Sequence, residues 1–137
     1  MAQNIKLEVV TPEKAVVDEE AKIVVAPGSL GEFGVLSGHT TFLTTLKTGI
    51  IRYTDANDQE HFVFVSGGFA EALPDKVTVL AESAERRRDI DLARAKAAIE
   101  RAEKRLAAQR QKESLDFTRA RAALERALQR LNLAETR

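Results

Sequence analysis

The glycine-rich stretch at residues 27–39 is the first place where this sequence could bind a ligand. It holds four of the chain's seven glycines, and glycine-rich loops can cradle phosphate groups with their backbone N–H groups. The stretch lacks both the Gly-Lys-Ser/Thr ending of a phosphate-binding loop and the Gly-x-Gly-x-x-Gly spacing of a dinucleotide site. We therefore predict a rigid loop with tight turns that presents its side chains at the surface.

Side chains that commonly catalyse reactions or bind metals are scarce. The chain has no cysteine and two histidines, His39 and His61. No nucleophile and base, and no pair of carboxylates, stand at a recognisable spacing. Because His39 falls in the glycine-rich loop, we interpret it as a hydrogen-bonding loop residue, and His61 as a residue of a predicted strand. The sequence thus predicts no catalytic residue, no metal site and no disulfide framework.

Short apolar segments in residues 1–85 predict a β domain. In the first of them Ile5, Leu7 and Val9 recur at every second position, the period of a half-buried strand. Many short strands with regular turns predict a sandwich or a barrel. The further strands are expected at residues 15–17, 21–26, 50–54, 61–65, 69–73 and 77–81, with turns at 11–13, 18–20, 55–58 and 74–76.

Two amphipathic helices are predicted from about residue 90 to residue 131. Apolar residues recur there at helical spacing, and no Gly or Pro follows residue 74. Polar residues 111–114 interrupt the pattern, so the two arms should fold back on each other. Asp89 or Asp91 is placed to cap the first helix. The apolar stripes are Leu92, Ala95, Ile99, Ala102 and Leu106 in the first arm, and Phe117, Ala120, Leu124, Leu128 and Leu131 in the second.

The predicted helical hairpin, residues 86–137, should be marginally stable by itself. It is also basic, whereas the predicted β domain, residues 1–85, is acidic. Much of its seam is alanine, and a buried methyl group contributes about 0.8 kcal/mol. Ordering one residue costs roughly 1–2 kcal/mol. Residues 1–85 carry 6 Lys or Arg and 13 Asp or Glu, and residues 86–137 carry 15 and 8, so their formal charges are −7 and +7. We expect a movable element that is attracted to acidic surfaces.

Two other classes of protein fit parts of this pattern. The run Arg86-Arg87-Arg88 and the basic helices would suit a module that binds nucleic acid or another anionic surface. Against it stand interspersed acids, an acidic β domain and a single helical aromatic, Phe117, on the apolar stripe. A free-standing coiled-coil adaptor would need stripes longer than the barely three heptads of each arm. No apolar run approaches the roughly 18 residues of a membrane span, and no targeting peptide is visible.

Four segments, taken in order, resemble the ε subunit family of F-type ATP synthase, called δ in mitochondria. They are residues 31–39 (Gly-Glu-Phe-Gly-Val-Leu-Ser-Gly-His), 66–68 (Ser-Gly-Gly), 77–81 (Val-Thr-Val-Leu-Ala) and 90–95 (Ile-Asp-Leu-Ala-Arg-Ala). The resemblance covers almost the whole chain. It implies an all-β sandwich of about ten short strands followed by a C-terminal antiparallel two-helix hairpin, in a non-catalytic subunit of the central stalk.

The resemblance also implies partners. The β domain would contact the γ subunit and the ring of membrane c subunits, with Glu32, Phe33, Gly34 and His39 at the contact. The helices would inhibit ATP hydrolysis when they extend toward the catalytic α and β subunits. The chain would lie at the cytoplasmic face of a bacterial plasma membrane, held there only through the complex, with a plastid membrane as the alternative.

Residues 90–95 match the Ile/Leu-Asp-x-x-Arg-Ala motif with which some bacterial members of that family bind ATP. By this resemblance ATP is expected as a regulatory ligand, and no cofactor is required. Guanidinium groups suit phosphates because they form charge-assisted hydrogen bonds. The plain alternative is an ordinary first-turn acid with solvated arginines on helix faces. The predicted nucleotide-binding residues are Ile90, Asp91, Arg94, Ala95, Arg126 and Arg130.

Overall fold

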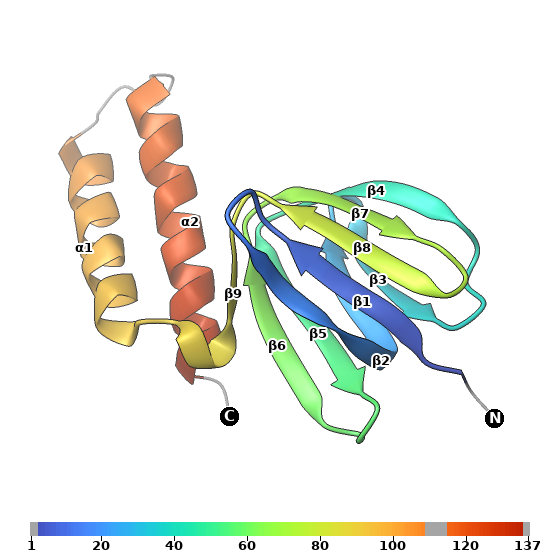
Figure 1. Ribbon diagram of the computed structural model, residues 1–137. Coiled ribbons are helices and arrows are strands. Elements are labelled where there is room, and N and C mark those ends of the chain that lie inside the picture. Colours follow the sequence, from blue (N-terminus) through green and yellow to red (C-terminus); the bar gives the residue numbers. More distant parts are fainter. Residues whose placement is uncertain (1–2, 109–114, 136–137) are drawn as a thin grey trace. The chain divides into compact units, whose positions relative to one another are not determined.

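The computed structural model describes residues 3–108 and 115–135. The chain divides into two compact units, Met1–Arg87 and Arg88–Arg137. Nine strands build the described part of the first unit, and two helices build that of the second (Figure 1). The predicted class, an all-β sandwich followed by an antiparallel pair of helices, is confirmed, with a strand count close to the expected ten.

The elements follow one another in a simple order. The strands are β1 (Ile5–Val10), β2 (Ala15–Gly28), β3 (Gly31–Leu36), β4 (Phe42–Leu46), β5 (Gly49–Asp55), β6 (Glu60–Val65), β7 (Gly68–Ala72), β8 (Lys76–Ala81) and β9 (Ala84–Arg86). A short 3-10 helix, η1 (Arg87–Asp89), then precedes the helices α1 (Leu92–Ala108) and α2 (Leu115–Glu135).

The long strand β2 takes part in both layers of the sandwich. Its first half pairs with β1, and its second half pairs with β5 and β3. From β1 the order continues through β8, β7 and β4, and β4 returns to β2 at Gly28 (Figure 1). Beyond β5 lie β6 and β9. Because alternate residues of most strands point inward, the enclosed core is mostly aliphatic, around residues such as Ile5, Val24 and Val79.

The acidic residues 18–20 lie within β2, so the turn predicted there is wrong. All three pair with residues of β1 across an antiparallel register. Nζ of Lys6 lies 3.6 Å from Oδ1 of Asp18 and 3.3 Å from Oε1 of Glu8. Backbone pairing and the cross-strand ion pair between Lys6 and Asp18 offset the low strand propensity of acidic residues.

The glycine-rich stretch 27–39 is mainly a β-hairpin, so the loop predicted there is wrong. Strand β2 runs to Gly28, a two-residue turn follows, and β3 begins at Gly31. Gly31 has a φ of +138°, and a Cβ added at Gly28 would lie 2.6 Å from the carbonyl oxygen of Gly31. The glycines are needed because the two strands approach each other closely at this turn.

The β domain ends with a strand that the sequence pattern did not indicate. Strand β9 pairs with β6 through three residues, with Arg86 opposite Val63. Its sequence, Ala-Glu-Arg, is too short and too polar to show an alternation. Only the pairing with a strand twenty residues earlier defines it.

Both predicted helical arms are confirmed. Oδ1 of Asp91 accepts a hydrogen bond from the backbone N–H of Arg94 at 3.0 Å, so Asp91 is the cap of α1. Asp89, the other candidate, lies in η1. Figure 1 shows α1 and α2 side by side and antiparallel, and the two helices pack against each other. The predicted break at residues 111–114 lies outside the described residues.

Two leucines expected on the apolar stripes are exposed. Leu92 is 39% exposed and Leu128 is 46% exposed. The apolar stripe of α2 runs from Ala120 to Leu124, four residues on, and then to Ala127, three residues on. Ala127 therefore occupies the buried position that was predicted for Leu128. The buried apolar residues of the described helices are Ala95, Ala102, Ala120, Ala127 and Leu133.

Candidate functional site

Three of the four predicted partner-binding residues lie in β3, divided between its two faces. Glu32 and Gly34 lie on its exposed face, in one row with Leu36, whereas Phe33 packs against the core. Leu30, at the tip of the preceding turn, is fully exposed. Sequence reasoning missed Leu30 and Leu36, because an apolar residue among glycines gives no signal of the face that it will take.

Glu32 has a partner within the β domain. Its Oε1 accepts a hydrogen bond from Nη2 of Arg52 in β5 at 2.8 Å, and the pair spans the intervening strand β2. Both side chains are about half exposed, so the pair contributes only about 0–1 kcal/mol to stability. It orients the carboxylate while leaving it accessible at the surface.

Phe33 and His39 meet at a third aromatic residue, Phe42 of β4. The ring of Phe33 contacts that of Phe42 edge to face with centroids 5.0 Å apart, and the ring of His39 lies 5.2 Å from it. The Nδ1–H of His39 donates to the carbonyl oxygen of Thr40 at 2.7 Å. The prediction of a hydrogen-bonding His39 is confirmed, and these contacts support the connection between β3 and β4.

The first four predicted nucleotide-binding residues lie around the start of α1. Ile90 and Asp91 precede the helix, Arg94 is exposed in its first turn, and Ala95 is buried. The N–H of Ala95 donates to the carbonyl oxygen of Asp91 at 3.0 Å, beside the carboxylate cap. Asp91 therefore fixes the turn from which Arg94 projects, whereas Ala95 has little surface to offer a ligand.

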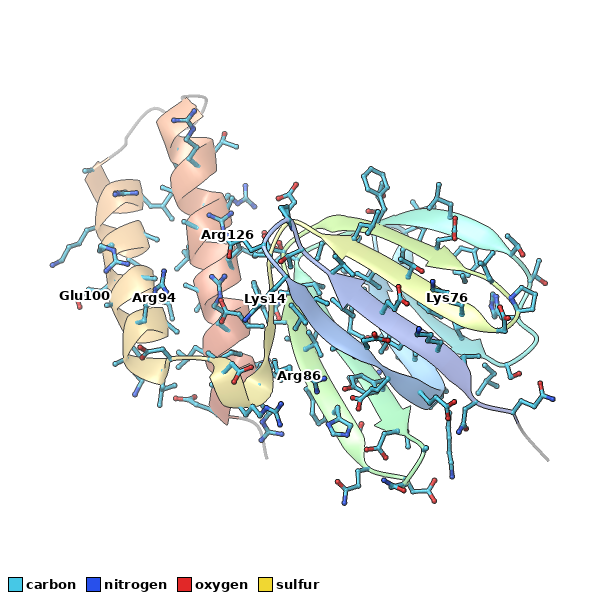
Figure 2. The ribbon with its side chains drawn as sticks, viewed as in Figure 1. Lys14, Lys76, Arg86, Arg94, Glu100 and Arg126 are labelled. Carbon is cyan, nitrogen blue, oxygen red and sulfur yellow. The ribbon has the colours of Figure 1, made fainter. Side chains whose placement is uncertain are left out.

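The other two predicted residues, Arg126 and Arg130, lie four residues apart in α2. Residues at this spacing share one helix face, and both arginines are partly exposed. Figure 2 shows Arg94 and Arg126 on α1 and α2, the two helices that pack together. Guanidinium groups on two adjacent helices can donate charge-assisted hydrogen bonds to phosphate oxygens.

The arginine run 86–88 does not form a continuous basic surface. Arg86 donates hydrogen bonds inside the β domain. The guanidinium carbon of Arg87 lies 5.4 Å from the ring centroid of Phe62, within the range of a cation–π contact. Only Arg88 of the three is exposed. This arrangement gives no support to a nucleic-acid interface at the run.

The β domain also carries an apolar groove that sequence reasoning missed. Its volume is about 610 Å³. Phe69 of β7 and Leu80 of β8 are cross-strand neighbours and are 52% and 56% exposed. Contiguous exposed apolar groups of this kind mark interaction sites. The one available signal was Leu80, a large apolar residue at an outward position of the segment 77–81. The lining includes Val10, Pro12, Leu46, Phe69, Leu80 and Glu82.

Two family models together match nearly the whole chain. The beta-sandwich domain of the ATP synthase Delta/Epsilon chain matches residues 4–87, and the long alpha-helix domain of that chain matches residues 88–135. The chain belongs to the ATP synthase delta/epsilon family. The membership expected from four short segments is thereby confirmed.

Curated relatives of this ε-family chain agree with that assignment. It is 66% identical over 106 residues to the ATP synthase epsilon chain of Desulfosudis oleivorans, covering 77% of this chain and 80% of the relative. It is 67% identical over 107 residues to that of Desulforapulum autotrophicum, covering 78% of this chain and 79% of the relative.

The fold of this ε-family chain recurs in two solved assemblies. A chain of the Euglena gracilis mitochondrial ATP synthase structure (OSCP/F1/c-ring) superposes with a TM-score of 0.78 at 22% identity, covering 91% of this chain and 78% of that one. A chain of the Tetrahymena thermophila mitochondrial ATP synthase structure (central stalk/c-ring) superposes with a TM-score of 0.59 at 10% identity, covering 97% of this chain and 98% of that one. At these identities the likeness shows a shared fold.

The described residues of this ε-family chain contain neither a membrane-spanning helix nor a group of metal ligands. Neither α1 nor α2, as far as they are described, is long and apolar enough to cross a membrane. Within residues 3–108 and 115–135, no group of three or more His, Cys, Asp or Glu side chains could hold a metal ion. Indirect membrane attachment and the lack of a required cofactor remain predictions.

Proposed function

We propose that this chain is a non-catalytic central-stalk subunit of F-type ATP synthase that couples the catalytic head to the c-ring and inhibits ATP hydrolysis. The observation that carries this proposal is the similarity to ε chains, which runs through both units in the order of the family's two domains. The chain would lie at the cytoplasmic face of a bacterial plasma membrane, attached only through the complex.

The apolar groove is our candidate contact for the γ subunit. Phe69 and Leu80 are large apolar side chains exposed on paired strands, and burying them against a partner removes apolar surface from water. Aromatic residues at the centre of such a patch often supply much of the binding energy. Glu82 at the rim favours a partner with a basic side chain nearby.

The exposed row on β3 is our candidate contact for the c-ring. Leu30 and Leu36 offer apolar anchors, and the carboxylate of Glu32 is oriented between them by Arg52. Phe33 and His39 would act behind this row, because both pack on Phe42. Gly34 leaves room in the row for a side chain of the partner.

The helical unit is the candidate inhibitory element. Four of its five buried apolar residues in the described helices are alanines, so the packing of α1 on α2 supplies little stabilisation. A weakly held pair of helices can open when a partner binds the open form more tightly. The net positive charge of residues 86–137 favours acidic surfaces of the α and β subunits.

ATP is our candidate regulatory ligand of the helical unit. Arg94, Arg126 and Arg130 would donate to its phosphates, and Ile90 would contact the base beside the cap residue Asp91. A ligand that contacts both helices would stabilise their packed arrangement, and thereby reduce inhibition.

Deleting residues 90–137 in the assembled complex tests the inhibitory function. The deletion retains the whole sandwich and the residues of η1. We expect the truncated subunit to assemble and ATP hydrolysis to rise, because the inhibitory element is gone. Unchanged hydrolysis in a complex that contains the truncated subunit would refute an inhibitory role for the helices.

A further inference from the structure

The side chain of Arg86 ties the last strand of the β domain to β2 and β5. Its Nε–H donates to the carbonyl oxygen of Val16 at 3.1 Å, and Nη1 donates to the hydroxyl of Tyr53 at 3.1 Å. Nη2 lies 3.6 Å from Oε1 of Glu19, and the hydroxyl of Tyr53 donates to that same carboxylate oxygen. We call these four residues the Arg86 clamp. Figure 2 labels Arg86 in β9.

The clamp is partly shielded from water, and its most exposed charged side chain, that of Glu19, is 35% exposed. Tyr53 is fully buried, the side chain of Arg86 is 19% exposed, and the ring of Tyr53 stacks on that of His61 with centroids 4.9 Å apart. Burial, followed by the hydrogen bond to Glu19, raises the pKa of Tyr53 well above 10.0. The hydroxyl therefore keeps its proton and remains a donor. Hydrogen bonds to ionised groups are stronger in such shielded surroundings.

Strand β9 has few backbone partners, although its Ala84 is part of the core. It is three residues long, stands at the end of the strand order and pairs only with β6. So short an edge strand has few ladder hydrogen bonds and would open readily without side-chain support. The 3-10 helix η1, which begins at Arg87, follows β9 directly, and Ile90 and Asp91 then lead into α1. The clamp therefore lies just before the connection to the helical unit.

We propose that the Arg86 clamp fixes the end of the β domain, so that the helical unit turns about residues 88–91. Without the clamp, β9 would separate from β6 and lengthen the connection between the two units. A short hinge restricts the orientations that the helical unit can take, because each released residue adds backbone freedom. The inference rests on the proposed movement of the helices, since only a moving unit needs a hinge.

Hydrogen–deuterium exchange of the full chain tests the clamp. Arg86→Met keeps the apolar stem and removes every side-chain donor, and Arg121→Met makes the same charge change at an exposed position of α2, outside the clamp and the hinge. We expect the amides of β9 to exchange about tenfold faster in Arg86→Met, because a shielded charge-assisted network is lost. The β9 amides of Arg121→Met should exchange as in the parent.

Tyr53→Phe provides a milder second variant should Arg86→Met fail to fold. It removes one hydroxyl and keeps the ring that stacks on His61. Faster exchange confined to β9 is expected here as well. Unchanged β9 exchange in the folded variants would overturn the clamp.

Distance measurements between spin labels test the hinge itself. Because the chain has no cysteine, Glu71→Cys in β7 and Glu103→Cys in α1 place two labels at exposed positions. We expect a broader distribution of label distances with Arg86→Met or Tyr53→Phe than with Arg121→Met. An equal width despite faster β9 exchange would overturn the hinge.

These outcomes are separable from those for the proposed function. If deletion of residues 90–137 leaves hydrolysis unchanged, the inhibitory role fails, and the exchange experiment still reports on the clamp. If β9 exchange is unchanged while the deletion raises hydrolysis, the clamp fails and the inhibitory role stands.

Discussion

Nε2 of His61 lies 2.7 Å from Oδ2 of Asp55, and this pair closes the turn between β5 and β6. The other carboxylate oxygen of Asp55 accepts hydrogen bonds from the backbone N–H groups of Asn57 at 2.8 Å and Gln59 at 3.0 Å. Asp58, inside the turn, has a φ of +62°. One carboxylate thus satisfies three donors and holds a turn that contains a left-handed residue.

Acid should destabilise the β domain in part through Asp55. The hydrogen bond from His61, followed by that from Gln59, lowers the pKa of Asp55 below 3.8. A carboxylate whose pKa is lower in the folded state stabilises fully above its unfolded pKa, and loses this contribution as the pH falls through the lowered value. We expect Asp55→Asn to be less stable than the parent at neutral pH and to lose less stability on acidification.

Urea unfolding at neutral and acidic pH checks this prediction. Tyr53 is the only tyrosine in a chain without tryptophan, so its fluorescence reports on the β domain. Asp75→Asn, at an exposed position in the turn before β8, is the control. Equal acid sensitivity of Asp55→Asn and the parent would contradict the role of Asp55.

Gly68 should tolerate no side chain. It has a φ of +115°, and an added Cβ would overlap the carbonyl oxygen of Leu80. We expect Gly68→Ala to destabilise the β domain by roughly 2–4 kcal/mol, because neither backbone can move without breaking the pairing of β7 with β8. Gly34→Ala is the matched control: its nearest neighbour would be Cγ2 of Val25 at 3.9 Å. Similar urea midpoints for both variants would argue against this steric explanation.

The side-chain cap of Asp91 should contribute about 1 kcal/mol to the stability of α1. Asp91→Ala removes the acceptor for the N–H of Arg94, whereas Asp91→Asn keeps a side-chain oxygen there. We expect the helical circular dichroism signal of Asp91→Ala to be lost at a lower temperature, with Asp91→Asn close to the parent. Identical melting of all three chains would show that the cap does not limit the stability of α1.

Substitutions in the apolar groove should separate partner binding from folding. Leu80→Ala removes a half-exposed side chain, so we expect it to change the free energy of unfolding by less than about 1 kcal/mol. Its affinity for isolated γ subunit should fall by about 2 kcal/mol, roughly thirtyfold, if Leu80 is central to the contact. Leu43→Ala, at an exposed leucine of β4 outside the groove lining, is the control. Calorimetric titrations that show equal losses for both would count against the groove as the γ site.

ATP titration followed by amide NMR tests the nucleotide site. We expect shifts confined to the helical unit of the parent chain, and at least about a tenfold weaker response in Arg126→Gln, because a charge-assisted hydrogen bond is lost. Arg101→Gln, at an exposed position of α1, controls for the change in net charge. The absence of shifts in the parent at millimolar ATP would reject the site.

Local patterns in the sequence predicted much of the fold. Alternation located β1, short apolar segments between turns located β5, β6 and β8, and helical periodicity located both arms of the hairpin. Each of the four family segments is an unbroken run of residues, so the sequence alone indicated the family. Of the candidate residues, Glu32 was correctly expected at the surface. Its partner Arg52, twenty residues away, could not be read from the same pattern.

By itself the sequence determined the strand and helix periods, the family and the opposite charges of the two halves, because these depend on residues near one another along the chain. Only the tertiary structure decided that Arg86 leaves the basic run to reach Val16, seventy positions earlier. It also decided that Pro12, Phe69 and Leu80 line one groove, and that the acids at 18–20 stay in β2. Those outcomes depend on strand pairing and burial between distant segments. The free energy of such contacts cannot be predicted from local sequence patterns.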